Sequence, residues 1–183
     1  HGNAWYQSLS SSLPKLQVFS LAQYFLSGPI HPSSANLQSL SEICLDNINL
    51  SSTIPEFLAD FSNLTSFISA IFMDFSNNIF SGAIPYLHIL KNITHLDLSN
   101  NLLTGVISST AWEQLLNLVF VDLGNNSLNG NISLFLFELS ILQRLQLADN
   151  QFDGQIPEFS NASSSAIDTL NLIGNKLYRP FPI

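Results

Sequence analysis

Three aspartates with similar local surroundings, Asp74, Asp97 and Asp122, recur at intervals of about 24 residues. If the chain places successive segments side by side as strands, their carboxylates lie roughly 5 Å apart along one face. Carboxylates in that arrangement could bind a cation or act as a general acid–base pair. The alternative, which we favour, is that they are solvated or accept hydrogen bonds from neighbouring backbone.

Other side chains with catalytic potential form no recognised constellation. The sequence contains no G-x-S-x-G elbow, phosphate-binding loop or protein-kinase signature. The histidines, His1, His31, His88 and His95, lack metal-ligand spacing. The single cysteine, Cys44, has no basic residue near it in sequence to lower the pKa of its thiol. We therefore expect no enzymatic activity, no metal and no cofactor, and a passive cysteine.

The composition indicates a folded, acidic protein. Apolar residues make up 46% of the 183 residues, charged residues make up 10%, and the formal net charge is −8. This composition excludes a disordered chain, and so few basic residues argue against a nucleic-acid partner. No apolar run of about 18 residues predicts a membrane span. No basic-then-apolar leader opens the sequence, so we expect a fragment or a processed chain.

A repeated pattern explains where the aspartates fall. The segments "ITHLDLSNNLLTGVI" (93–107), "NLVFVDLGNNSLNGNI" (117–132) and "LQRLQLADNQFDGQI" (142–156) align with one another. They follow L-x-x-L-x-x-L-x-L-x-x-N-x-L-x-G-x-I-P, a leucine-rich repeat in which we number the first leucine position 1. The pattern predicts a single solenoid over residues 1–183 with about seven repeats, which start near Leu13, Leu37, Phe61, Leu90, Leu115, Leu139 and Ser164.

Stacked repeats of this kind align short parallel strands, with irregular turns between them. Positions 7 and 9 are apolar and point inward, whereas positions 6, 8 and 10 point outward. Position 12 is an asparagine, whose amide can satisfy backbone groups where the chain turns. Its neighbour Asn125 at position 11 is expected to be outward and replaceable. The structural asparagines are Asn78, Asn101, Asn126, Asn150 and Asn175.

The repeat over residues 61–89 is irregular. Its first half follows the phase of Phe61, whereas its second half, from Met73 onward, lies six residues out of phase. One explanation is a six-residue bulge at about 68–72. The other, which we favour, is that two half-repeats were joined across a deletion, because each half by itself follows the pattern.

The residues after the asparagine, such as "SGAIP" (81–85) and "DGQIP" (153–157), resemble the plant-specific class of leucine-rich repeat, an α/β-type repeat of mostly short strands. This resemblance implies a right-handed superhelix with a parallel concave sheet and a second short strand in each turn. The segments "VDLGNNSLNGNISLFLFEL" and "NQFDGQIPEFSNASSSAIDTLNL" further resemble ectodomains of plant receptor-like proteins of the Verticillium wilt resistance and Cf types.

That resemblance implies a non-catalytic ligand-recognition module on the extracellular face of the plasma membrane, which acts in pathogen recognition and defence signalling. It also implies a protein or peptide ligand, a receptor-kinase co-receptor, and membrane attachment only through segments outside this sequence. The chain departs from the family in lacking cysteine-paired caps, a membrane helix and most of the repeats. The alternative is a secreted inhibitor of a cell-wall-degrading enzyme, similar to polygalacturonase-inhibiting proteins.

Two sets of surface residues follow from this interpretation. Outward aromatics such as Phe72 and Phe120 are candidate anchors for a ligand, although they could equally pack sideways against neighbouring strands. The full set of candidate concave-face contacts is Glu42, Asp46, Phe72, Asp74, His95, Asp97, Phe120, Asp122, Arg144, Gln146, Thr169 and Asn171. The N-x-S/T sequons, compatible with a secreted glycoprotein, are Asn49, Asn63, Asn92, Asn125, Asn131 and Asn161.

Overall fold

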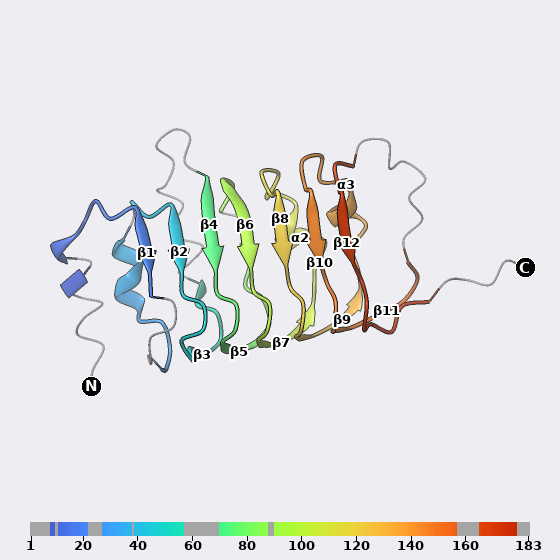
Figure 1. Ribbon diagram of the computed structural model, residues 1–183, viewed down its shortest axis with the longest axis horizontal. Helices are drawn as coiled ribbons and strands as arrows, with labels where there is room; N and C mark the ends of the chain where they lie inside the picture. The colour runs from blue at the N-terminus through green and yellow to red at the C-terminus, as the bar shows by residue number, and fades with distance from the viewer. Residues whose placement is uncertain are drawn as a thin grey trace, which may run out of the picture.

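The computed structural model describes residues 8–9, 11–21, 27–37, 39–56, 70–87, 90–156 and 165–178. Within these residues, two sheets of short parallel strands run along the long axis of the molecule (Figure 1). The main sheet has seven strands, β1 (Val18–Ser20), β2 (Glu42–Cys44), β4 (Ile71–Asp74), β6 (Ile93–Asp97), β8 (Phe120–Asp122), β10 (Arg144–Gln146) and β12 (Thr169–Asn171). The second sheet has five, β3 (Ser51–Ser52), β5 (Ile79–Gly82), β7 (Leu102–Val106), β9 (Ser127–Asn131) and β11 (Gln151–Asp153).

Each repeat contributes one complete turn of the chain. A strand of the main sheet leads through a tight turn to a strand of the second sheet, and the chain then returns to the next main strand. The return segments carry short helices, η1 (Pro32–Asn36), α2 (Ser109–Trp112) and α3 (Phe135–Glu138). Every pairing between strands is parallel and joins neighbouring repeats. The structure thus confirms the predicted leucine-rich-repeat solenoid, including its second strand.

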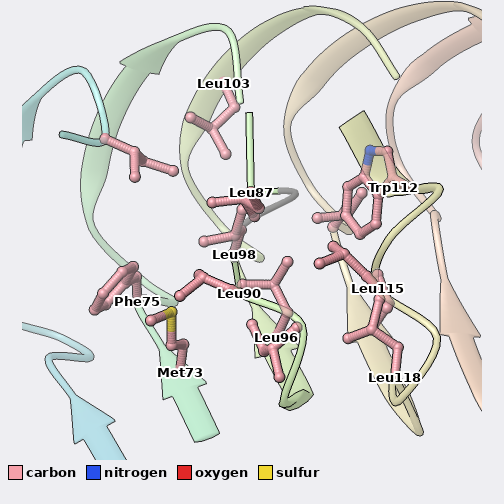
Figure 2. Close-up of a cluster of buried hydrophobic side chains, with 14 of the residues drawn as sticks. Met73, Phe75, Leu87, Leu90, Leu96, Leu98, Leu103, Trp112, Leu115 and Leu118 are labelled. Carbon is pink, nitrogen blue, oxygen red and sulfur yellow. The ribbon is translucent and has the colours of Figure 1, made fainter. Parts of the chain in front are cut away.

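The hydrophobic core lies between the two sheets and the return segments. Side chains alternate along each main strand, so the central residue of β8, Val121, is fully buried while its neighbours are half-exposed. Figure 2 shows Leu96 and Leu98 pointing into this core beside Met73, with Trp112 from α2 on the same side. Burial of each such leucine stabilises the fold by about 1.5–3 kcal/mol. The inward rows of successive repeats therefore form one continuous core that no single repeat could build.

The position-12 asparagines join consecutive turns through hydrogen bonds. Asn126 donates from Nδ2 to the carbonyl of Leu98 in the preceding repeat (3.0 Å) and lies 3.1 Å from that of Leu123 in its own repeat. Its Oδ1 accepts a hydrogen bond from the backbone N–H of Leu103 (3.0 Å), near the start of strand β7 in the second sheet. Equivalent bonds are made by Asn78, Asn101, Asn150 and Asn175.

Position 11, directly before the asparagine, has a left-handed backbone in successive repeats. The φ angle is 54° at Asn77, 56° at Asn100, 53° at Asn125 and 53° at Asp149. In the last described repeat Gly174 takes the same place, with φ 72°. Asparagine, aspartate and glycine are the residues that tolerate this conformation. The paired asparagines of the repeat therefore have separate tasks, one set by backbone geometry and the other by hydrogen bonding.

The irregular repeat over residues 61–89 pairs with its neighbours in the usual way from β4 onward. Residues 57–69, which include the predicted repeat start at Phe61, lie outside the described residues, as do the start at Ser164 and the sequons at Asn63 and Asn161. From β4 onward the register is regular except at one point, where Ile71 pairs with Ile93 but Phe72 pairs with His95. Thr94 is therefore an extra residue in β6. Its hydroxyl donates to the carbonyl of Ile71 (3.3 Å).

Candidate ligand-binding face

The outward face of the main sheet carries two parallel rows of side chains. Strand register aligns Phe72, His95 and Phe120, which we call the aromatic row. Two residues further along the same strands, register aligns Asp74, Asp97 and Asp122, which we call the carboxylate row. All six side chains are half-buried and point away from the core. The two rows lie roughly 6.6 Å apart along the strands, and their members repeat about every 4.8 Å across them.

The aromatic row is a stack of three rings. His95 lies between the two phenylalanines, with ring centroids 5.3 Å from Phe72 and 5.9 Å from Phe120. The ring planes are inclined by 31° and 20° respectively. The imidazole Nδ1 also lies 3.0 Å from the hydroxyl of Thr94, and burial lowers the pKa of His95 below its usual value. Both predicted anchors thus pack sideways on the same histidine while part of each ring stays accessible.

The carboxylate row caps the turns that follow the strands. Oδ1 of each aspartate accepts a hydrogen bond from the backbone N–H two residues later: Ser76 for Asp74 (3.0 Å), Ser99 for Asp97 (2.9 Å) and Gly124 for Asp122 (2.8 Å). At the same position in β12, Asn171 accepts from Ile173 (3.2 Å). Because a neutral amide makes the same bond, the turn requires an acceptor but no charge.

The negative charges of this row are poorly compensated. Burial raises the pKa of Asp97 to about 6, hydrogen bonds from Ser99 oppose that shift, and the charges of Asp122 and Asp74 add to it. Burial also raises the pKa of Asp122, against the hydrogen bond from Gly124 and with a contribution from Asp74. None of the three aspartates forms an ion pair with a described lysine or arginine. The row is therefore electrostatically strained when it is fully ionised.

The remaining candidate contacts flank these rows. Glu42 extends the aromatic row at β2, and Arg144 and Thr169 extend it at β10 and β12. Cys44, Gln146 and Asn171 extend the carboxylate row in the same way. Asp46 joins neither row, because it follows β2 and accepts a hydrogen bond from the amide of Asn47 (2.8 Å).

Cys44 has the surroundings of an unreactive thiol. Burial raises its pKa to about 12, together with a hydrogen bond to Glu42 (3.6 Å) and the negative charges of Glu42, Asp74 and Asp46. The thiolate required for nucleophilic or redox chemistry is thus strongly disfavoured. Among the described residues, no group of three or more His, Cys, Asp or Glu side chains could hold a metal ion.

A small apolar cavity of about 10 Å³ lies in the core beside Met73 and Phe75, closed on other sides by residues that include Ile54 and Ile84. That volume is about the minimum for one water molecule, and its apolar lining gives a water no partners. In the part of the chain that the structure describes, no helix is long and apolar enough to cross a membrane.

The members of both rows could be predicted from the sequence, but their ring stack was not. The motif places Phe72, His95 and Phe120 at position 6 of successive repeats, and this is the signal from which a stack could have been inferred. In the structure, the register shift at Thr94 brings Phe72 opposite His95. The left-handed backbone at position 11 was not predicted either, although the recurrence of Asn, Asp and Gly there points to it.

Comparisons with known proteins agree with this geometry. A family model described as Leucine Rich Repeat matches residues 92–112. A search of curated protein sequences gave no match. Among solved structures, the ectodomain of the Arabidopsis thaliana receptor kinase GASSHO1/SCHENGEN3, in complex with CASPARIAN STRIP INTEGRITY FACTOR 2, superposes with a TM-score of 0.81. The two are 30% identical over 93% of this chain and 20% of that one.

Two further structures show the same relationship. PEPR1 with AtPEP1 is 31% identical, with a TM-score of 0.78 over 88% of this chain and 22% of that chain. The Arabidopsis receptor kinase HAESA, with the peptide hormone IDA and the co-receptor SERK1, is 28% identical, with a TM-score of 0.69 over 93% and 31%. The present chain thus spans between a fifth and a third of these proteins. It is a leucine-rich-repeat solenoid that is structurally similar to the ectodomains of plant receptor kinases.

Proposed function

We propose that this chain is the extracellular ligand-recognition region of a plant cell-surface receptor-like protein, and that it binds a protein or peptide on the outward face of its main sheet. The observation that carries this proposal is the pair of half-exposed rows, held in register on a parallel sheet of seven strands. Rigid repeats present such extended surfaces for binding, and aromatic side chains commonly anchor partners.

The structural relatives support a peptide ligand and a co-receptor. One is the ectodomain of a plant receptor kinase in complex with CASPARIAN STRIP INTEGRITY FACTOR 2, and a second contains PEPR1 and AtPEP1. A third is the receptor kinase HAESA with the peptide hormone IDA and the co-receptor SERK1. Each aspartate of the carboxylate row uses Oδ1 to cap a turn, and burial raises the pKa of the Cys44 thiol to about 12, so the exposed side chains of this face favour binding over catalysis. Binding without catalysis is therefore the function that this surface supports best.

The test is a peptide-display selection against the chain secreted from plant cells and immobilised. Peptides enriched on the wild-type protein should lose binding to a Phe72→Ser/Phe120→Ser double variant. They should keep binding to Val106→Ser, which removes an apolar side chain that is 64% exposed on the second sheet. The proposal would be overturned if the enriched peptides bound the double variant as tightly as the wild-type protein, or if the selection enriched no peptide.

We propose further that the ligand comes from a pathogen and that binding triggers defence. The ground for this proposal is the resemblance of the sequence to receptors of the Verticillium wilt resistance and Cf types. Leaves that express the whole protein should give an oxidative burst with a pathogen culture filtrate, and leaves that express the double variant should not. The alternative function, inhibition of a polygalacturonase, predicts reduced pectin cleavage when the secreted chain is added to the enzyme. The acidic face favours neither function over the other, because it could meet a basic enzyme as well as a basic peptide.

A further inference from the structure

We propose that the outward face selects an extended peptide segment in which basic and apolar side chains alternate, with the basic side chains over the carboxylate row and the apolar ones over the aromatic row. This inference rests on the proposed function and names the class of ligand. It assigns one partner chemistry to Phe72, His95 and Phe120 and another to Asp74, Asp97 and Asp122.

The two rows can accommodate an extended chain that lies across the strands. Consecutive side chains of an extended peptide point to opposite sides, and every second side chain lies roughly 6.6–6.8 Å further along. A peptide placed between the rows therefore directs alternate residues toward one row and then the other. Three members on each row, repeated about every 4.8 Å, span roughly 10 Å, enough for two side chains on each side.

Charge gives the carboxylate row its preference. Each aspartate uses Oδ1 to cap its turn, and the side chain of Ser99 adds a second hydrogen bond to Asp97. The charged or titratable groups around Asp97 are Asp74 on β4, Asp122 on β8 and His95 on its own strand. The two carboxylates repel its ionised form, which is part of the reason that its pKa is raised to about 6. A lysine or arginine side chain above the row would relieve that repulsion.

The side chains of the aromatic row are preorganised for contact with apolar side chains of a ligand. The contacts of His95 with Phe72 and Phe120 hold all three rings in place before any ligand arrives. Because these side chains are already ordered, binding costs less rotamer entropy than it would with free aromatic side chains. The rings are half-buried, so an apolar partner would cover the part that remains exposed.

Charged residues at both ends fix where the basic side chains lie. Glu42 flanks the rows at β2, where it adds negative charge, whereas Arg144 flanks them at β10 and repels a cation. Arg144 pairs in register with Phe120, so it lies one strand beyond the three-ring stack. The basic residues of a ligand should therefore lie over β4, β6 and β8 and not over β10.

The experiment compares capped peptides of about eight residues by fluorescence anisotropy with the full chain. An alternating lysine–leucine peptide should bind about tenfold tighter than a peptide with the same residues in two blocks, and than an alternating glutamate–leucine peptide. Binding of the alternating peptide should weaken about tenfold in Asp97→Asn/Asp122→Asn, a variant that keeps both turn caps. Its affinity should also fall when the pH is lowered from 7 to 5, because Asp97 becomes protonated.

The matched control is Asp153→Asn, which removes a carboxylate from an exposed position on the second sheet. It should leave binding unchanged. Equal binding of the alternating and block peptides, or an equal loss in the Asp153 variant, would show non-specific charge attraction and overturn the inference. If display selection returns neutral peptides that depend on Phe72 and Phe120, the proposed function stands and only this inference fails. If the selected peptides bind equally well when Phe72 and Phe120 are replaced, the proposed function itself fails.

Discussion

At the scale of single residues, Asp97 combines a structural task with an unfavourable charge. Its Oδ1 caps the turn at Ser99, while burial and two neighbouring carboxylates resist its ionisation. Asn171 makes the corresponding bond in the last described repeat without any charge. The negative charge of Asp97 is thus not required for the turn, and the repeat tolerates it at a cost in stability that should depend on pH.

Asp97→Asn should therefore raise thermal stability at neutral pH and change the pH dependence. The pKa of Asp97 is about 6 in the folded protein against 3.8 for the unperturbed group, so the folded state holds its proton to higher pH. The wild-type protein loses stability from this group as the pH rises from about 4 to about 7. The difference in Tm between Asp97→Asn and wild type should grow over that range in thermal melts at constant ionic strength. A difference that is constant or shrinks with pH would contradict the prediction, and Asp153→Asn serves as the control.

At the scale of elements, the turns that connect the two sheets depend on two adjacent asparagines with different tasks. Asn126 ties its repeat to the preceding one through Leu98 and Leu103. Asn125 adopts φ 53° and donates from its side chain to Oδ1 of Asn100 (2.7 Å). The first supplies hydrogen bonds to buried backbone, and the second supplies a backbone conformation.

Asn126→Leu should destabilise the stack by more than about 2 kcal/mol, because several backbone groups lose their partner and each one left buried and unpaired costs about 1–3 kcal/mol. The measurement is urea unfolding followed by circular dichroism. Asn125→Gly is the matched control and should change the unfolding free energy by less than about 1 kcal/mol, since glycine accepts a left-handed backbone. A neutral Asn126→Leu would mean that these bonds contribute little.

The expectation that Asn125 can be freely replaced is wrong for side chains that disfavour a left-handed backbone. Its φ of 53° means that Asn125→Gln should cost about 1 kcal/mol, although the side chain points outward. Comparison of the glycine and glutamine variants in the same unfolding experiment separates the backbone effect from loss of the side-chain bond to Asn100. Equal stabilities for the two would exclude the backbone effect.

At the scale of the whole molecule, apolar surface collects near the last described repeat. On and after β12, Leu170 is 40% exposed, Ile173 75% and Tyr178 55%, whereas the equivalent Leu145 of β10 is fully buried. Exposed apolar side chains beside the edge of a sheet favour association between copies. The exposure at this repeat contrasts with the closed core of the preceding ones.

The 183-residue chain by itself should therefore self-associate at micromolar concentrations. Ile173→Asp should reduce the associated fraction, measured by size-exclusion chromatography with light scattering. Leu102→Asp is the matched control, because Leu102 is 57% exposed at the start of β7, in a repeat that two others separate from the repeat of β12. A wild-type chain that remains monomeric, or a Leu102 variant that is equally effective, would contradict this assignment.

Glycans on a secreted chain should also follow the structure. Asn49 and Asn131 are exposed, whereas Asn92 is half-buried just before β6. The amide nitrogen of Asn125 already donates to Asn100, so a glycan there would disturb the turn. Peptide mapping of protein secreted from plant cells should find high occupancy at Asn49 and Asn131 and the lowest at Asn125. Full occupancy of Asn125 in well-folded protein would show that the turn tolerates the glycan.

The amino-acid sequence by itself determined the repeat and which side chains of the main strands point inward or outward, although position 10, expected outward, is buried at Ser76 and Ser99. A pattern that recurs about every 24 residues specifies which positions are apolar, and strand alternation then assigns the inward and outward sets. Asn101 could be identified as a bonding residue from its position alone, because a recurrent polar residue beside buried leucines needs backbone partners. Local chemistry was enough for these predictions because each repeat contacts only its neighbours.

Only the tertiary structure decided what the outward residues do to one another. The stack of Phe72, His95 and Phe120 depends on the register between β4 and β6, which one extra residue shifts. The raised pKa of Asp97 arises from burial and from carboxylates about 24 residues away in sequence, so no local pattern contains it. Distances between repeats set these properties, and the sequence of a single repeat does not encode them.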